Sequence, residues 1–344
     1  MIELKRDDLV FTFPDIHSEA QLRITFQRTL RIPDDDKVYP LPPGLGSFPL
    51  RHVDDFTKTV PEQWIQHGGV MMPMYQSEAL WINFSSKYLS KHRTEYPFAV
   101  KIATGKINAV TGDEWANGLN LDPQDYMVAS EQPWLDGYCV EKGLIRQFVA
   151  MPLGSGYSAE EQLSGKAEHG GMQIIVYPMK KSVFEKRFPE RDEELHAEIM
   201  CYSKCMSICE NAEPDMGLAP GGKMKQDIYE DPYDIEDWDQ SVNSRCFVHL
   251  ANSLVWRSLT GKEPPTVPFT AREYTRAGLP WFDYYNEKAA HVDGTDKLKG
   301  MKSVVQMGKK KGDKPLPENE SVEVESVIPI QKKFAKDQVR EGAF

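Results

Sequence analysis

Residues 144–152 read LIRQFVAMP, and this stretch decides the fold class. It is a run of mostly apolar residues that ends at Pro152, which has no backbone N–H to donate to a sheet. A short run of this kind, closed by proline, is typical of a β-strand. The segment GMQIIVY at residues 171–177 has the same character and ends at Pro178. We therefore expect a β-rich protein.

Further strands are predicted on the N-terminal side of this stretch. Residues 22–27 alternate between apolar and polar side chains, as a half-buried strand does, and residues 80–84 form another strand. Residues 99–103 and 106–110 flank Thr104-Gly105. A two-residue loop with glycine between alternating runs indicates a hairpin. Residues 20–180 are therefore expected to be mostly antiparallel β, with short links.

The pattern changes after about residue 180. Apolar side chains recur at helical spacing between residues 192 and 209, and a second helix is predicted from Asp239 or Ser241 to Gly261. The apolar face assigned to the second helix consists of Phe247, Leu250, Ala251, Leu254 and Val255. Thr270 and Glu273 fit a capping box for a further short helix. The predicted fold class is α+β, with a mostly antiparallel β N-terminal half and a helical C-terminal half over residues 185–290.

The domain organisation is expected to be simple. Residues 1–312 form a single globular unit, and residues 313–344 form an extended C-terminal tail. Residues 322–330 alternate at first like an edge strand, so we expect this part of the tail to pack on the body or on a neighbouring subunit.

Charge and hydropathy exclude several classes of protein. The net charge of −11 disfavours a nucleic-acid partner, because an acidic surface repels phosphate backbones. The start of the chain has no signal peptide, and no apolar run approaches the ~18 residues of a membrane helix. We therefore expect a soluble, cytoplasmic protein with no membrane association.

Two sequence motifs bear on cofactor chemistry. Residues 217–224, GLAPGGKM, match G-x4-G-K, but Met224 cannot ligate magnesium, so the segment is interpreted as a flexible connector. Cys201, Cys205 and Cys209 recur every four residues. They are either metal-binding thiolates or small buried hydrophobic residues, and the pattern leaves both readings open. No cofactor and no metal site are predicted.

A dense group of polar residues lies between residues 133 and 173. His169, next to Glu168 and followed by two glycines, is a candidate general base. Asp136 and Arg146 complete the set of candidate catalytic residues. Trp134, Gln147 and Gln173 are candidate binding residues in the same region. The alternative interpretation is that these side chains lie on solvated strand faces and turns.

A second polar group is assigned to the helix predicted from Ser241. At helical spacing, one face opposite the leucines carries Arg245, His249, Asn252 and Trp256. This face is either solvated or a binding surface. We expect Trp256 to be covered, because a large aromatic side chain is seldom left exposed.

Several segments resemble a family of uncharacterised microbial proteins. They are WLDG at 134–137, IRQFVAMPLG at 145–154, LPWFD at 279–283, RIPDD at 31–35 and MKQDIY at 224–229. The resemblance runs over most of the chain, which implies one evolutionary unit, and it implies no activity.

Two functional hypotheses follow from these observations. The first is a non-catalytic binding or structural protein that self-associates as a homo-oligomer, because no complete catalytic signature is present. The second is an enzyme that acts on a small polar ligand through a pocket around His169, Glu168, Asp136 and Arg146. A pocket in which these four side chains converge would favour the enzyme.

Overall fold

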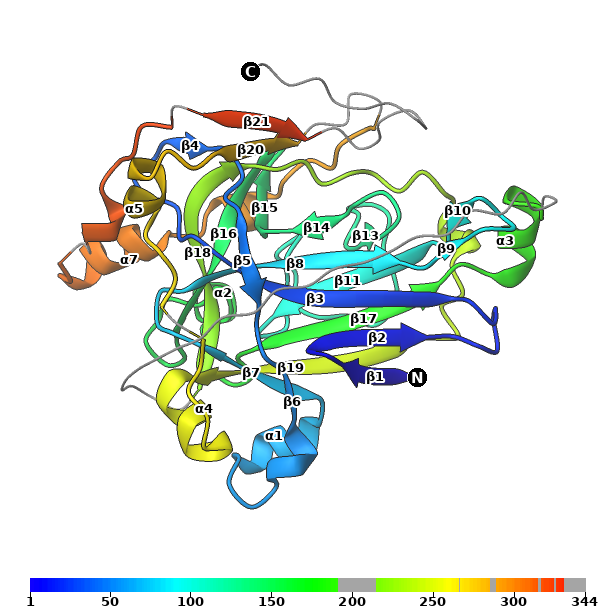
Figure 1. Cartoon of the computed structure of the whole chain (residues 1–344), viewed down its shortest axis with the longest axis horizontal. Helices are drawn as coiled ribbons and strands as arrows, with labels where there is room; N and C mark the ends of the chain where they lie inside the picture. Colours follow the sequence, from blue (N-terminus) through cyan, green and yellow to red (C-terminus); the bar gives the residue numbers. More distant parts are fainter. Residues whose placement is uncertain (191–214, 266, 285–288, 315–316, 325, 331–344) are drawn as a thin grey trace.

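The protein is mostly β. The computed structural model describes residues 1–190, 215–265, 267–284, 289–314, 317–324 and 326–330. Strands make up 38% and helices 18% of the structure. Two large sheets form the body, and most of the short helices lie around their margins (Figure 1).

The first sheet has ten strands. Its main path runs in the order β1 (Ile2–Lys5), β2 (Asp8–Thr12), β3 (Gln21–Thr29), β8 (Ala79–Ser86), β16 (Leu144–Pro152), β18 (Met216–Lys225) and β4 (Val38–Tyr39). Three strands pair at its sides: β14 (Trp134–Leu135) with β8, β15 (Gly137–Glu141) with β16, and β5 (Gly44–Ser47) with β3. All these pairs are antiparallel except β18 with β4.

The second sheet has seven strands. Its order is β12 (Ile107–Asn108), β11 (Phe98–Thr104), β17 (Met172–Pro178), β19 (Ser244–Asn252), β7 (Val70–Met74) and β6 (Arg51–His52), with β13 (Met127–Val128) on β11. Two small pairs lie outside both sheets: β9 (Tyr88–Leu89) with β10 (Thr94–Glu95), and β20 (Trp281–Tyr284) with β21 (Val327–Ile330).

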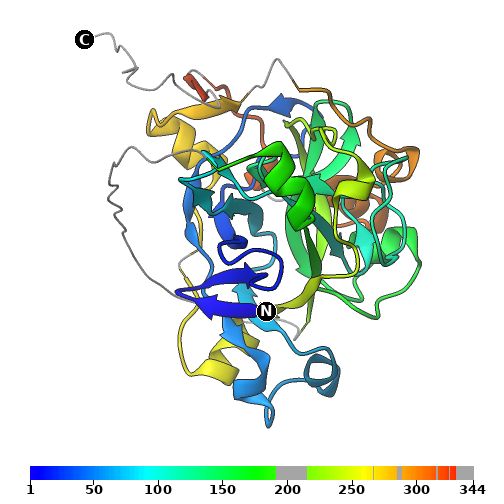
Figure 2. The same cartoon turned by 90° about the vertical axis from the view of Figure 1, so that its right-hand side faces the viewer.

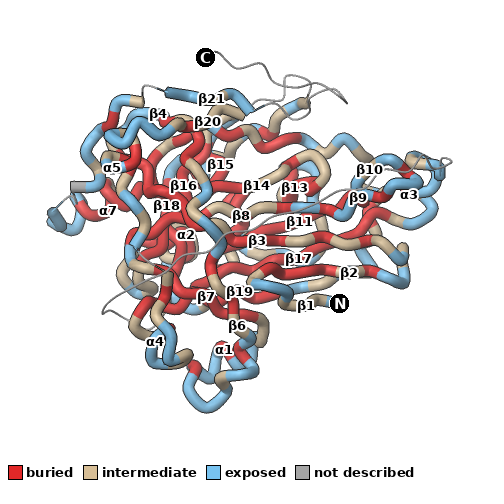
Figure 3. The backbone as a smooth tube through the Cα atoms, viewed as in Figure 1, coloured by how far each residue is buried: buried red, intermediate tan, exposed pale blue. Residues whose placement is uncertain are grey.

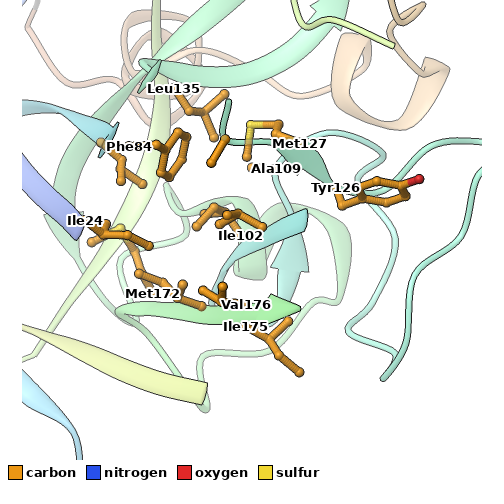
Figure 4. Packing of buried hydrophobic residues seen from close by; sticks show 14 of the residues in the cluster. Ile24, Phe84, Ile102, Ala109, Tyr126, Met127, Leu135, Met172, Ile175 and Val176 are labelled. Atoms are coloured by element: carbon orange, nitrogen blue, oxygen red, sulfur yellow. The ribbon is translucent and has the colours of Figure 1, made fainter. Parts of the chain in front are cut away.

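The main hydrophobic core joins the two sheets. Ile24 and Phe84 of the first sheet belong to the same buried cluster as Ile102 and Val176 of the second. Figure 4 shows these side chains turned toward one another. Buried residues are concentrated along the central strands, whereas helices α1 and α3 at the periphery are mostly exposed (Figure 3).

The helices are short. They are α1 (Glu62–His67), α2 (Ala159–Leu163), α3 (Lys181–Arg187), α4 (Ser253–Thr260), α5 (Ala271–Arg276), α6 (Asp296–Lys299) and α7 (Val304–Lys311), with 3-10 turns η1 (Val53–Phe56), η2 (Ile235–Asp237) and η3 (Pro317–Asn319). Helices α1 and α4 lie together at one end of the body in both views (Figures 1 and 2). Trp64 of α1 and Trp256 of α4 share one buried cluster there.

The strands predicted from the sequence are confirmed. Strands β3, β8, β16 and β17 cover the predicted segments, and β11 and β12 form the predicted hairpin. Because Thr104 pairs with Ile107, the loop residues are Gly105 and Lys106 rather than Thr104 and Gly105. Both have positive φ, 53° and 60°, as a tight hairpin turn requires.

The predicted α+β class with a helical C-terminal half is wrong. The segment predicted as a helix from Ser241 to Gly261 is strand β19 followed by the short helix α4, and only Gly261 fulfils its expected role as the C-cap of that helix. Residues Cys246–Asn252 are all buried, because β19 lies between β17 and β7 and is covered on both faces. A strand without an exposed face shows no alternation, so its apolar run fits a helical period equally well.

The segment at residues 217–224 is also not a flexible connector. It lies in β18, which pairs with β16 over most of its length. Gly222 is needed there, because a Cβ atom would lie 2.4 Å from the backbone oxygen of Pro33. The helix predicted over residues 192–209, with Cys201, Cys205 and Cys209, falls outside the described residues.

Candidate functional site

Asp136 and Arg146, two of the four candidate catalytic residues, have structural partners. Asp136 is buried, and its carboxylate accepts a hydrogen bond from Gln226 at 2.7 Å. Burial raises the pKa of Asp136 to about 7, against the effect of that hydrogen bond. Arg146 donates from Nη1 to the backbone oxygen of Gly221 at 3.0 Å and lies 3.7 Å from Asp34.

His169 and Glu168 lie in a different place, on the turn between α2 and β17. Buried Glu160 holds this turn, because its carboxylate accepts hydrogen bonds from the backbone N–H groups of Glu168, His169 and Gly170 at 2.8–2.9 Å. Burial, together with nearby Lys106, lowers the pKa of His169. The adjoining cavity of about 140 Å³ is lined by Glu168 and His169 but not by Asp136 or Arg146. This cavity therefore does not bring the four candidate residues together. The enzyme hypothesis stays a prediction.

The three candidate binding residues of the same region are used within the fold. The side chain of Gln147 joins Leu30 and Ile32, accepting from one backbone N–H and donating to one backbone oxygen. Gln173 bridges Lys106 and Gly170 in the same way. The ring of Trp134 packs 4.7 Å from that of Tyr284 and 6.1 Å from that of Trp81.

The row of four residues assigned to one helical face does not exist, because the helix is not there. Arg245 is at the exposed start of β19, and Asn252 caps α4 by accepting a hydrogen bond from Leu254 N–H. His249 is buried, stacks 4.6 Å from Trp64 and has a pKa that burial lowers to about 3. Trp256 is only 1% exposed, so the expectation that it is covered is confirmed.

The strongest site in the structure surrounds Arg31, which the sequence reasoning did not select. Arg31 follows β3, and its neighbours Leu30 and Ile32 are held in place by Gln147. Its side chain is only 6% exposed. Three distant segments surround it: residues 76–78, which precede β8, helix α7, and the turn η3.

The guanidinium of Arg31 is incompletely paired. Its Nη2 donates to Asn319 Oδ1 at 3.1 Å, while Glu318 Oε2 lies 3.9 Å from Nη1, beyond hydrogen-bonding distance. Among the residues that the structure describes, Nε and Nη1 have no hydrogen-bond partner. Burial lowers the pKa of Arg31, which nonetheless remains charged at neutral pH. Buried charged donors are normally paired, so this site can accept an anion.

Two cavities meet at Arg31. The larger, of about 160 Å³, extends under α7 and is lined by Gln76, Ser77, Met151, Tyr157, Val304, Val305, Gly308, Lys309, Asp313, Lys314 and Asn319. The smaller, of about 50 Å³, lies toward α5 and is lined by Tyr75, Gln76, Ser77, Glu78, Val267, Pro268, Phe269, Thr270 and Glu318. Lys309 and Lys314 add positive charge at the outer edge of the larger cavity.

Helix α7 is held over the larger cavity by an acid next to Arg31. Asp34 accepts a hydrogen bond from the backbone N–H of Val305 at 2.9 Å, and Arg146 lies close to the same carboxylate. Arg146 was selected from the sequence as a catalytic candidate. In the structure it is the charge partner of the residue that positions α7.

Comparison with known proteins adds no function. The sequence matches no protein-family model, and searches of the curated proteins and of the solved structures find no similar protein. No helix within the described ranges is long and apolar enough to cross a membrane. The same ranges contain no group of three or more His, Cys, Asp or Glu side chains that could hold a metal ion, and Cys201, Cys205 and Cys209 lie outside them.

Proposed function

We propose that the protein binds a small anionic molecule at Arg31. The observation that carries this proposal is a guanidinium that is almost fully buried, has two nitrogens without a hydrogen-bond partner among the described residues, and lies beside a cavity of about 160 Å³. The hydrogen bonds that these nitrogens leave unmade are a cost to the folded state, although Asn319, Glu318 and Asp34 compensate part of the charge. A carboxylate or phosphate oxygen in the cavity would accept from Nε or Nη1 and offset that cost.

We also propose that this role is binding rather than catalysis. The described residues that line the two cavities at Arg31 include Ser77 but no histidine that could activate its hydroxyl as a nucleophile. The positive groups Arg31, Lys309 and Lys314 are suited to holding an anion and do not form an acid–base pair.

Thermal unfolding in the presence of anions tests the proposal. A ligand that binds only the folded state raises Tm, so a small anion such as acetate or butyrate should raise it at constant ionic strength. Arg31→Met removes the charge but keeps the length of the side chain, and it should abolish the shift. Arg245→Gln is the matched control, because Arg245 is exposed and remote from the cavity residues, and it should behave as the wild type. An undiminished shift in Arg31→Met would show that anions bind elsewhere.

Self-association, expected from the sequence, is a second proposal. It is supported by Val267 and Phe269, two apolar side chains that are 59% and 67% exposed and lie two residues apart. Large exposed apolar side chains in one place favour a protein partner. Light scattering coupled to gel filtration should give a mass above that of one chain, and Phe269→Ser should lower it. A wild-type mass equal to one chain at all concentrations would contradict the proposal.

A further inference from the structure

The charges inside the larger cavity limit the charge of its ligand. Arg31 is the buried cation, whereas Lys309 and Lys314 are exposed. The acid that lines the same cavity, Asp313, already accepts a hydrogen bond from the hydroxyl of Tyr157. One buried guanidinium is balanced by one negative charge. A dianion such as phosphate would bring a second charge out of water without a buried partner, which is unfavourable.

One wall of this cavity is largely apolar. Met151 of β16, Tyr157, and Val304 of α7 form part of one buried hydrophobic cluster that adjoins Arg31. The hydroxyl of Ser77 donates to the sulfur of Met151 at 3.8 Å, and the hydroxyl of Tyr157 donates to Asp313, so both are already paired. An alkyl or aryl group would therefore fit against this wall without leaving a polar group unpaired.

The volume of the cavity suits a small organic molecule. A cavity of about 150 Å³ is large enough to hold a molecule of the size of benzene, and this one measures about 160 Å³. A carboxylate at Arg31 with a short chain or a ring behind it would fill the space. Inorganic phosphate would leave the apolar wall uncovered.

We infer that the ligand is a short amphipathic carboxylic acid, with its carboxylate on Arg31 and its apolar body against Met151, Tyr157 and Val304. This inference rests on the proposed anion-binding function and deepens it. The carboxylate accepts from the unpaired Nε or Nη1 of the guanidinium, and the apolar body is removed from water by the wall beneath α7.

Calorimetric titration with acetate, butyrate, hexanoate and phosphate tests the ligand class. Each methylene group buried against the wall should raise the affinity about fourfold. Butyrate, with two more methylene groups, should therefore bind about fifteenfold more tightly than acetate, and more tightly than phosphate. Affinity that does not depend on chain length, or phosphate that binds more tightly than butyrate, would overturn the amphipathic acid while leaving anion binding at Arg31 in place. Failure of every anion to bind would overturn both.

Two variants localise the apolar body. Val304→Thr keeps the shape of the side chain and adds a hydroxyl to the wall, so it should lower the affinity for butyrate severalfold and leave acetate almost unchanged. Lys314→Gln, at the exposed edge, is the control and should reduce the affinities for both acids by a similar, small factor. Equal responses of the two acids to Val304→Thr would overturn the placement of the chain against α7.

Discussion

Arg28 and Arg31 are three residues apart and equally buried, yet their surroundings differ. Each is 6% exposed. Arg28 donates from Nε to Glu78 Oε1 at 2.9 Å, and its Nη2 lies 2.9 Å from the same oxygen. Arg31 also has a glutamate nearby, but Oε2 of Glu318 lies 3.9 Å from its Nη1. Burial of an arginine alone therefore does not indicate a binding site, whereas a buried arginine that lines a cavity and lacks hydrogen-bond partners among the described residues is a candidate for one.

The difference follows from where each partner comes from. Glu78 directly precedes β8, which pairs with β3, and it lies two residues from Leu80, the partner of Arg28, so the sheet itself places the acid within reach of Arg28. The same carboxylate accepts from the backbone N–H of Tyr75, which holds it in position. Glu318 belongs to the turn η3 and is 44% exposed, so water competes for its carboxylate. Arg31 is thus left with unused donors at the mouth of a cavity.

Removing each guanidinium should give the largest contrast. Arg28→Met leaves Glu78 buried without its cation and should lower the free energy of unfolding by about 3–5 kcal/mol. Arg31→Met removes a charge that is already poorly paired. It should change the free energy of unfolding by no more than about 1 kcal/mol, in either direction. Urea denaturation at pH 7 measures both. Equal losses would show that Arg31 is as completely paired as Arg28.

Asp136 extends the comparison to a buried acid, and its effect depends on pH. Its carboxylate accepts a hydrogen bond from the neutral amide of Gln226, and burial raises its pKa to about 7. Because this pKa is above that of the unfolded chain, the folded state binds more protons between about pH 4 and pH 7. The stabilisation is complete below about pH 4 and is lost as the pH rises through 7.

Asp136→Asn keeps an oxygen that can accept from Gln226 and removes the titrating group. The variant should match the wild type near pH 4 and exceed it at pH 8 by as much as about 4 kcal/mol. Denaturation curves at a series of pH values measure the difference. Parallel pH profiles of the two proteins would mean that Asp136 stays ionised in the folded state across this range.

Glu318→Gln should give the smallest effect and the most specific one. Its carboxylate is the internal anion closest to the unpaired Nη1, so it opposes the entry of a ligand anion. The variant should bind butyrate about two- to fivefold more tightly, which corresponds to the modest energy of an exposed charge pair. Glu320→Gln is the control, because Glu320 pairs with Arg272 instead and should leave the affinity unchanged. A lower affinity in Glu318→Gln would show that Glu318 helps to hold the ligand.

The sequence predicted those parts of the fold that local signals specify. Apolar runs closed by Pro152 and Pro178, the alternation at residues 22–27 and the glycine turn at 105 are all short-range features. Each is decided by backbone geometry within a few residues, and each strand is present in the structure. Thr270 and Glu273 form the expected capping box for the same reason.

Local signals failed where packing removed the alternation. Strand β19 is buried from Cys246 to Asn252 by neighbours on both sides and both faces, so its residues show no period of two. The surroundings of the polar candidates could not be predicted from the sequence for a related reason. Gln147 and Gln173 look like solvated groups in the sequence, but they satisfy backbone atoms of segments that only the fold brings near.

The sequence by itself determined a β-rich chain, its main strands and a short capped helix, because these depend on neighbours along the chain. Only the tertiary structure decided that Arg31 is a candidate site. Between Leu30 and Ile32, an arginine reads as the polar side of an extended segment. Its burial, its missing partners and its cavity all come from Ser77, α7 and η3, which lie about 45 to 290 residues further along the chain. The free energy of an unpaired charge depends on what surrounds it in space, and no local pattern carries that information.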